Sequence, residues 1–292
     1  MESWKNWKVL TILVVAILLG IRGYMFLSGG MVVSPDVPSL SYTAELYETT
    51  DISDVWKIKY PSSGTEIYGL LSIPRDSGPG KMPAFVLLPA NSIPKEDEHK
   101  WAGTLLNEMG FVTLSLDQRG HGETRAEVRS IEQDIQYYVN GRDTVQHLMV
   151  EDALNAFEIL KLRPEVDESR IYMLGESMGG RFAIMSAAGE PDVAGVVVIS
   201  SSGYGFPETG RPEVDEFLYS IDPDNFIDDI SPRNLLMIHA TEDSVIPIDK
   251  AKDTFSRAGT PKKFFELNAS FHGFLKEGTG IEDVLRQELS GW

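Results

Sequence analysis

Arg170–Gly180, with the sequence R-I-Y-M-L-G-E-S-M-G-G, decides the fold of this chain. Ile171–Leu174 is a continuous apolar run, as in a buried parallel strand, and the small and apolar residues of 181–188 are typical of a helix packed beside it. Residues 175–179 between them have the pattern G-x-S-x-G. This pattern places a serine on a sharp strand-to-helix turn, where glycines avoid the collision that a Cβ would cause. Ser177 is therefore the predicted nucleophile.

The same turn predicts one donor for a negatively charged oxygen. The first amides of the following helix, at the positive end of its dipole, point toward an oxyanion formed beside the serine. The backbone N–H of Met178 is the candidate. The competing interpretation is a tight strand–helix connection without chemistry, since any Gly-Ser turn before a helix would have this pattern.

A nucleophilic serine needs a base, and in folds with this turn the partners follow in the order serine, acid, histidine. The chain has five histidines, of which two, His239 and His272, follow Ser177. His239 lies inside the apolar run Asn234–Ala240, which predicts a central strand and a packing or supporting role. His272 lies in a loop after the strand-like Lys263–Leu267, so it is the predicted base.

The acid should lie between the serine and the histidine, at the end of the strand before the histidine. Asp243 is in the turn that follows Asn234–Ala240, where a carboxylate can accept the imidazole N–H and fix the tautomer that receives the serine proton. Its neighbour Glu242 is the alternative acid.

These motifs together resemble a serine hydrolase of the α/β-hydrolase superfamily, in the branch of dienelactone hydrolase-like and prolyl oligopeptidase-like esterases and peptidases. The resemblance covers roughly residues 55 to 290. Its landmarks, in the expected order, are Leu87–Ser92, Asp117–Gly122, Gly175–Gly179, and His239–Pro247 with Phe271–Phe274. In such families the aspartate stands four residues before the proline of Val/Ile-Pro, as Asp243 does, which favours Asp243 over Glu242.

The resemblance also implies a second oxyanion donor, in the loop after the strand Ala84–Leu88. Many relatives have His-Gly there, whereas this chain has Pro89-Ala90-Asn91-Ser92. By position the N–H of Ser92 is the first candidate and that of Asn91 the second. Asp117–Gly122 matches the D-x-R-G-H-G turn of the superfamily, which implies a structural role for His121.

The fold expected from the resemblance is an α/β-hydrolase domain over residues 54–292, with a mostly parallel central sheet flanked by helices. Val55–Tyr60 and Glu66–Ile73 alternate in hydrophobicity around a Pro-Ser-Ser-Gly turn, which predicts an edge hairpin. Residues 201–232 are too few for a cap domain and enough for a short lid.

The expected activity is cleavage of carboxylic esters through an acyl-enzyme intermediate. A short peptide is the alternative substrate, with a peptidase of the prolyl oligopeptidase type as the alternative enzyme and a non-catalytic binding relative as the alternative class. No cofactor is expected and no metal site is predicted. The formal charge of −18 and the pI near 4.7 argue against a nucleic-acid partner.

Residues 1–30 form a separate segment, followed by a Ser-, Thr- and Pro-containing stretch over 31–53 that we interpret as a tether. Residues 9–27 are almost entirely apolar, interrupted by Arg22, and are about long enough to span a bilayer. Lys5 and Lys8 precede the span and acidic residues follow it, so the N-terminus should be cytoplasmic and the hydrolase domain extracytoplasmic. The alternative is a signal peptide cleaved near Ser28-Gly29-Gly30, which would give a secreted enzyme.

Overall fold

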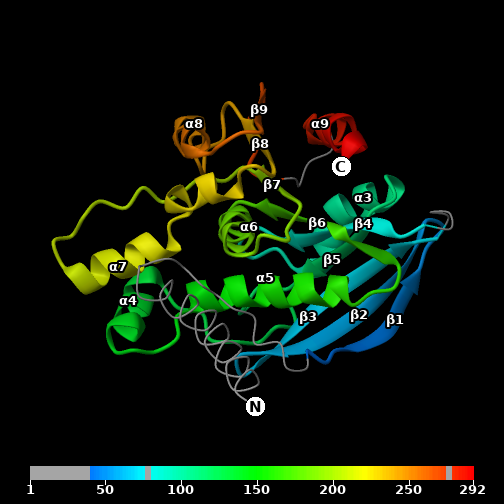
Figure 1. Cartoon of the computed structure of the whole chain (residues 1–292), viewed down its shortest axis with the longest axis horizontal. Helices are drawn as coiled ribbons and strands as arrows, with labels where there is room; N and C mark the ends of the chain where they lie inside the picture. The colour runs from blue at the N-terminus through cyan, green and yellow to red at the C-terminus, as the bar shows by residue number, and fades with distance from the viewer. Residues whose placement is uncertain (1–39, 76–79, 274–277) are drawn as a thin grey trace, which may run out of the picture. The chain divides into compact units, whose positions relative to one another are not determined.

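Strands of the described chain form one sheet in the order β1-β2-β3-β5-β4-β6-β7-β8-β9 (Figure 1). The computed structural model describes residues 40–75, 80–273 and 278–292. The strands are β1 Thr43–Thr49, β2 Ser53–Ser62, β3 Thr65–Pro74, β4 Met82–Leu88, β5 Val112–Leu116, β6 Val166–Glu176, β7 Gly195–Ile199, β8 Asn234–Ala240 and β9 Lys262–Leu267.

The sheet has an antiparallel part and a parallel part. β1, β2, β3 and β5 pair antiparallel in sequence, whereas β4 pairs parallel with β5 and β6, and β6 to β9 continue the parallel arrangement. The parallel strands are apolar runs because helices cover both of their faces, and every residue of β7 is buried. The mostly parallel central sheet of an α/β-hydrolase fold is confirmed, and the predicted hairpin is β2 and β3. Its predicted place at the sheet edge is wrong, because β1 pairs with β2 and forms that edge.

Helices cover the sheet on both faces (Figure 1). Their bounds are α2 Lys95–Glu98, a π-helical turn His99–Gly103, α3 Thr104–Glu108, α4 Ile131–Val139, α5 Val145–Lys161, α6 Met178–Gly189, α7 Pro212–Ile221, α8 Ile248–Arg257 and α9 Ile281–Glu288, with 3₁₀ turns at Pro223–Asn225, Ile227–Ile230 and Leu289–Gly291. On one face α3 and α9 bury Leu106 and Leu285 against strand residues such as Phe85 and Leu174. On the other face α5 and α6 pack against β4 and β6.

Two connections between strands contain helices in addition to those that cover the sheet. The stretch before α5 forms α4, which begins with a capping box at Ser130 and Gln133. The segment expected to form a lid, residues 201–232 and called the lid segment below, contains α7 and two 3₁₀ turns, and α7 packs against α4. Tyr138 of α4 lies 5.3 Å from Phe217 of α7, centroid to centroid.

The predicted extent of the tether, residues 31–53, is wrong at its C-terminal end. Residues 43–49 form β1, which pairs with β2, so any tether ends before Thr43. All seven residues of β1 are exposed, so the strand lacks the alternation of buried and exposed residues that would identify it in the sequence.

The segment predicted as a membrane span or signal peptide, residues 9–27, lies outside the described residues. Within the described part of the chain, no helix is both long enough and apolar enough to cross a membrane.

Strand order brings the predicted site residues to one edge of the sheet. Ser177 follows β6, Asp243 lies beyond β8 and His272 beyond β9, and these strands are parallel with β7 between β6 and β8. Because parallel strands end on the same side, residues separated by almost a hundred positions meet there, the usual place for a site in an open α/β sheet.

Candidate active site

Ser177 occupies a strained turn between β6 and α6. Its backbone has φ 49° and ψ −113°, outside the regions that residues with a Cβ ordinarily adopt. β6 ends at Glu176 and α6 begins at Met178, so Ser177 alone makes the turn. Its N–H donates to the carbonyl of Ile199 in β7 at 2.9 Å. Such strain costs of order 1–3 kcal/mol and persists where surrounding contacts enforce it, typically at functional sites.

Two glycines after Ser177 permit this turn. A Cβ on Gly179 would lie 1.9 Å from the carbonyl oxygen of Leu88 and 2.6 Å from that of Pro89. A Cβ on Gly180 would lie 2.6 Å from the Cβ of Ser201. The first turn of α6 therefore packs directly on the loop after β4 and on the chain after β7.

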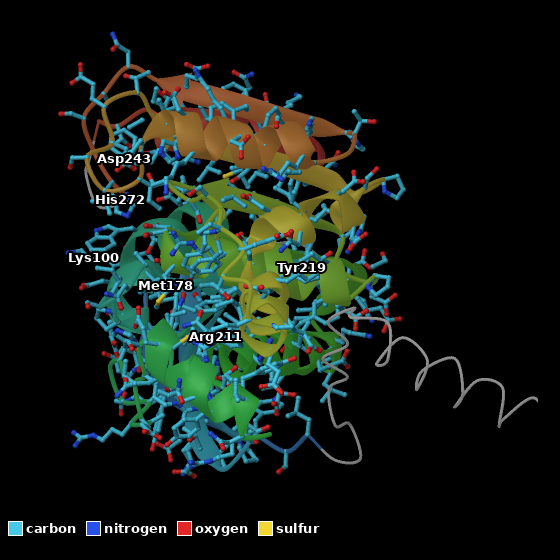
Figure 2. The ribbon with its side chains drawn as sticks, turned by 90° about the vertical axis from the view of Figure 1, so that its left-hand side faces the viewer. Lys100, Met178, Arg211, Tyr219, Asp243 and His272 are labelled. Carbon is cyan, nitrogen blue, oxygen red and sulfur yellow. The ribbon has the colours of Figure 1, made fainter. Side chains whose placement is uncertain are left out.

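The structure brings Ser177, His272 and Asp243 together. His272 Nε2 lies 2.8 Å from Ser177 Oγ, and His272 Nδ1 lies 2.8 Å from Asp243 Oδ2. Figure 2 shows Asp243 and His272 beside each other at one end of the domain. Since a carboxylate only accepts, Nδ1–H donates to Asp243, and Nε2 is left to accept the proton of the Ser177 hydroxyl.

Asp243 is held by several donors. Its buried carboxylate accepts, at Oδ1, the N–H groups of Val245 and Ile246 at 2.8 and 3.0 Å, which leaves Oδ2 for His272. Glu242, the alternative acid, is exposed. Of the two carboxylates, Asp243 is the one in contact with His272.

His239 supports the same aspartate. Its Nε2–H donates to the carbonyl of Ile246 at 2.8 Å, and Nε2 lies 3.4 Å from Asp243 Oδ2. Burial lowers the pKa of His239, partly opposed by the Ile246 carbonyl and Asp243, so the ring is neutral at pH 7. The supporting role predicted for His239 is therefore a contact with Asp243. The sequence alone, in which His239 stands four residues before Asp243, does not show this contact.

The candidate oxyanion loop lies against the start of α6. Residues 90–93 form a turn closed by a 3.1 Å bond from the N–H of Ile93 to the carbonyl of Ala90, with Ser92 at φ 69°. Gln118 Nε2 donates to the Pro89 carbonyl at 2.6 Å, and the His121 ring lies 3.1 Å from Asn91 Oδ1. Both contacts come from the turn after β5. The choice between the N–H of Ser92 and that of Asn91 stays a prediction.

Lys95 ties the other end of this loop to the turn after β5. Its backbone N–H and its ammonium both donate to the buried carboxylate of Asp117, at 2.9 and 2.8 Å. The ammonium also pairs with Glu96 and Glu123. Burial lowers the pKa of Lys95, but the hydrogen bonds to these three carboxylates outweigh it and raise the pKa. The network is structural, and within the described residues no group of three or more histidines and carboxylates could hold a metal ion.

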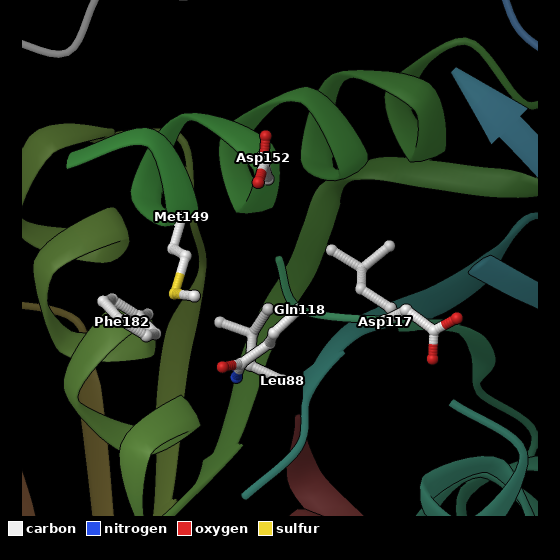
Figure 3. Close-up of a pocket in the computed structure, with 7 residues that line it drawn as sticks. Leu88, Asp117, Gln118, Met149, Asp152 and Phe182 are labelled. Carbon is white, nitrogen blue, oxygen red and sulfur yellow. The ribbon is translucent and has the colours of Figure 1, made fainter. Parts of the chain in front are cut away.

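Figure 3 shows residues that line a small cavity next to the end of β4. Its lining is mainly apolar and includes Leu88, Met149 and Phe182, together with the Gln118 side chain that holds Pro89. None of the predicted site residues is among those that line this cavity.

Asp222 fastens the lid segment. Its carboxylate accepts the N–H groups of Tyr204, Gly205 and Phe206 at 2.9, 2.8 and 3.3 Å. It therefore joins the start of the segment to the residue that ends α7. Tyr204 is stacked on Phe206 with their ring centroids 4.7 Å apart, and the Arg181 guanidinium lies 4.0 Å from the centroid of the Tyr204 ring.

Two buried carboxyl groups lie beneath the site, and sequence reasoning assigned no role to either. Glu176 precedes Ser177 and Glu98 belongs to α2, and each is 1% exposed. Burial, reinforced by the charge of Glu176, raises the pKa of Glu98 well above its usual value. A Cβ on Gly273, next to His272, would lie 3.0 Å from Glu176 Oε2. Glu176 therefore borders the loop that carries the histidine.

Comparisons with known proteins agree with this geometry. The model of a family described as acetyl xylan esterase (AXE1) matches residues 39–202, more than half of the chain. The uncharacterized protein YfhR of Escherichia coli K12 is 24% identical over 216 residues, which cover 72% of this chain and 70% of that protein. The monoglyceride lipase of Rattus norvegicus is 31% identical over 106 residues, covering 36% of this chain and 30% of the lipase.

Solved structures share the fold at low sequence identity. The acetyl xylan esterase of Paenibacillus sp. R4 has a TM-score of 0.71 at 19% identity, covering 87% of this chain and 89% of that one. Est1E of Butyrivibrio proteoclasticus, solved with ferulic acid, has a TM-score of 0.60 at 17% identity, covering 80% of this chain and 96% of that one. The protein has an α/β-hydrolase fold and belongs to the acetyl xylan esterase (AXE1) family of ester hydrolases.

Proposed function

We propose that this protein is a serine esterase that cleaves carboxylic esters through an acyl-enzyme on Ser177. The observation that carries the proposal is the continuous chain of contacts from Ser177 Oγ to His272 and from His272 to Asp243, with 2.8 Å at each step. Such a chain activates a hydroxyl that is otherwise a weak nucleophile. A non-catalytic binding protein would have no use for it.

The contacts give each residue a role in two half-reactions. Ser177 Oγ attacks the ester carbonyl carbon while its proton passes to His272 Nε2. The tetrahedral intermediate collapses, and the alcohol leaves with that proton. Water then attacks the acyl-enzyme by the same route, releasing the acid and restoring the serine. Asp243 keeps the Nδ1–H tautomer and stabilises the imidazolium that forms in each step.

The negative charge on the carbonyl oxygen needs fixed donors. The N–H of Met178 and that of Ser92 or Asn91 supply them in this proposal, supported by the close packing of Gly179 on Leu88 and Pro89. Removal of one such donor in other enzymes costs about 10²- to 10³-fold in kcat. Because both donors are backbone groups, they do not depend on the His-Gly sequence that many relatives have.

For the substrate, we propose small acyl esters, with acetyl esters of sugars as the first to test. The family name supports this choice, and so does the fold shared with acetyl xylan esterases. Measuring kcat/KM on p-nitrophenyl acetate, butyrate and octanoate and on acetylated xylan would rank the candidates. Higher activity on the octanoate than on the acetate would overturn the choice of acyl group.

Ser177→Ala and His272→Ala test the reaction itself. Each should lower kcat on p-nitrophenyl acetate by at least about 10³-fold, and the double variant should lose little more, because members of a triad act as a unit. Circular dichroism should show that the fold is retained. A fluorophosphonate should label wild type at Ser177, identified by peptide mass, and should not label Ser177→Ala. Near wild-type turnover by Ser177→Ala would contradict the proposal.

A further inference from the structure

The carbonyl oxygen of Ser177 accepts two hydrogen bonds. One comes from the N–H of Gly180 at 3.1 Å, and the other from the hydroxyl of Ser201 at 2.6 Å. A carbonyl only accepts, so the Ser201 hydroxyl must be the donor. Ser201 lies just beyond the end of β7, 24 residues after the nucleophile, and is fully buried.

This carbonyl belongs to the same peptide unit as the N–H of Met178. A peptide unit is planar and trans, so its C=O and its N–H point in opposite directions. A contact that fixes the direction of the Ser177 carbonyl therefore also fixes the direction of the Met178 N–H. The ψ of Ser177, −113°, sets this plane and lies outside the common regions, so contacts must hold the plane in place.

Ser201 is itself held in position. Ser200, before it, has φ 50°, and the N–H of Ser200 donates to the carbonyl of Ile238 in β8 at 3.0 Å. The Cβ of Ser201 lies close to Gly180, where a Cβ on the glycine would be 2.6 Å away. Ser201 is thus packed between the end of β7 and the first turn of α6, and its hydroxyl has little freedom to move.

From these contacts we infer that Ser201 is a positioning residue, whose hydroxyl aims the Met178 N–H at the oxyanion that forms on the substrate. The inference rests on the proposed serine esterase function. The hydrogen bond also polarises the Ser177–Met178 peptide, which makes its N–H a stronger donor. Because the oxyanion exists only during reaction, this effect stabilises the transition state and not the bound ester.

The chain offers a matched control in the adjacent residue. Ser200 and Ser201 are both fully buried, but the Ser200 hydroxyl has no hydrogen-bond partner within the described residues. Ser201→Ala and Ser200→Ala each delete one buried hydroxyl from neighbouring positions. Only Ser201→Ala removes a hydroxyl that donates to the Ser177 carbonyl.

The experiment uses the full chain with p-nitrophenyl acetate as substrate and an alkylboronic acid as transition-state analogue. Ser201→Ala should lower kcat about tenfold, with KM within about twofold of wild type. The loss is smaller than that for removing an oxyanion donor, because the Met178 N–H is still present but less well aimed. The boronic acid should inhibit it about tenfold more weakly. Ser200→Ala should stay within about twofold on each measure. The pH profile of kcat should keep its shape, since Ser201 contacts neither His272 nor Asp243.

Equal kinetics for the two alanine variants would overturn the inference, as would a Ser201→Ala variant with a lower Tm and unchanged kcat. If Ser201→Ala does not fold, Ser201→Cys replaces the hydroxyl with a somewhat larger group that is a weaker donor and should show an intermediate loss of kcat. A different result would contradict the proposed function itself: wild type that does not react with the fluorophosphonate at Ser177. If wild type reacts and Ser201→Ala turns over as wild type does, only the role of Ser201 fails.

Discussion

Both carboxylate oxygens of Asp243 have partners in the folded protein. Two backbone amides hold Oδ1, and Oδ2 meets His272 at 2.8 Å and His239 at 3.4 Å. This arrangement fixes the direction of the carboxylate before substrate arrives, so the tautomer of His272 is also set in advance.

Asp243→Asn should therefore lower kcat by about 10³- to 10⁴-fold with the fold intact, because the amide supports the wrong tautomer of His272. Glu242→Gln is the matched control, as an adjacent exposed carboxyl. Steady-state kinetics on p-nitrophenyl acetate measures both. Similar small effects from the two variants would move the acid away from Asp243, and Asp222 would not replace it without releasing the lid amides.

Glu98 links stability to pH. In the folded chain burial, reinforced by the charge of Glu176, raises the pKa of Glu98 well above the usual 4.5. The folded state therefore keeps a proton that the unfolded state releases above about pH 4.5, so this carboxyl lowers the free energy of unfolding as pH rises. Neither oxygen of Glu98 has a hydrogen-bond partner within the described residues to offset that loss.

Glu98→Gln removes the titrating group while retaining its shape. The Tm of the variant should be close to that of wild type near pH 4 and should exceed it increasingly toward about pH 8, above the usual pKa of 4.5. Differential scanning fluorimetry across this range checks the result. Asp283→Asn, an exposed carboxyl of α9, serves as control. A difference in Tm that is constant with pH would show that Glu98 does not titrate as proposed.

At the scale of elements, the contact between α6 and the loop after β4 holds the site together. α6 approaches Leu88 and Pro89 so closely that only glycine fits at position 179. Gln118 and Asp117, in the turn after β5, hold the same loop from the other side. The predicted oxyanion donors thus depend on how three elements pack.

Gly179→Ala should separate α6 from this loop. The new methyl would lie 1.9 Å from a backbone oxygen that cannot turn aside, and such overpacking costs typically about 1–3 kcal/mol of stability. We expect a lower Tm and at least about a tenfold loss of kcat, since an oxyanion donor moves. Gly80→Ala, where the added Cβ meets nothing within 4 Å, is the control. Unchanged kcat in Gly179→Ala would show that the loop takes no part in catalysis.

At the scale of the whole molecule, we propose that residues 9–27 hold the enzyme at a membrane with the hydrolase domain outside. The charges on either side of this segment support the orientation. Arg22, near its end, can reach the headgroups and so costs less than a charge at the centre of a span.

The full chain should therefore sediment with membranes and stay there in high salt, because an apolar span is held by burial and not by charge. External protease on intact cells should release an active fragment. A chain of residues 31–292 should remain in the supernatant. A mature protein that begins near Met31 would show cleavage instead, and protection from external protease would contradict the orientation.

The sequence by itself determined the strands of the parallel sheet and the candidate triad. Buried strands and the glycine turn at Ser177 are local patterns. Their order along the chain limited the choice of histidine to His239 and His272, and the place of His239 inside a predicted strand left His272. The sequence missed β1 because all seven of its residues are exposed, so no apolar period marks it. A strand covered on both faces is recognisable in the sequence as an apolar run, whereas an exposed edge strand such as β1 has no such pattern.

Only the tertiary structure decided which neighbours meet. Asp243 and Glu242 are adjacent and chemically alike, but the amides of Val245 and Ile246 hold the carboxylate of Asp243, and this carboxylate is the one that meets His272. Ser201 contacts Ser177 because β7 lies beside β6, and the fold brings Glu98 within range of the charge of Glu176. Such contacts join residues far apart in the chain through hydrogen bonds and close packing, which no local pattern encodes.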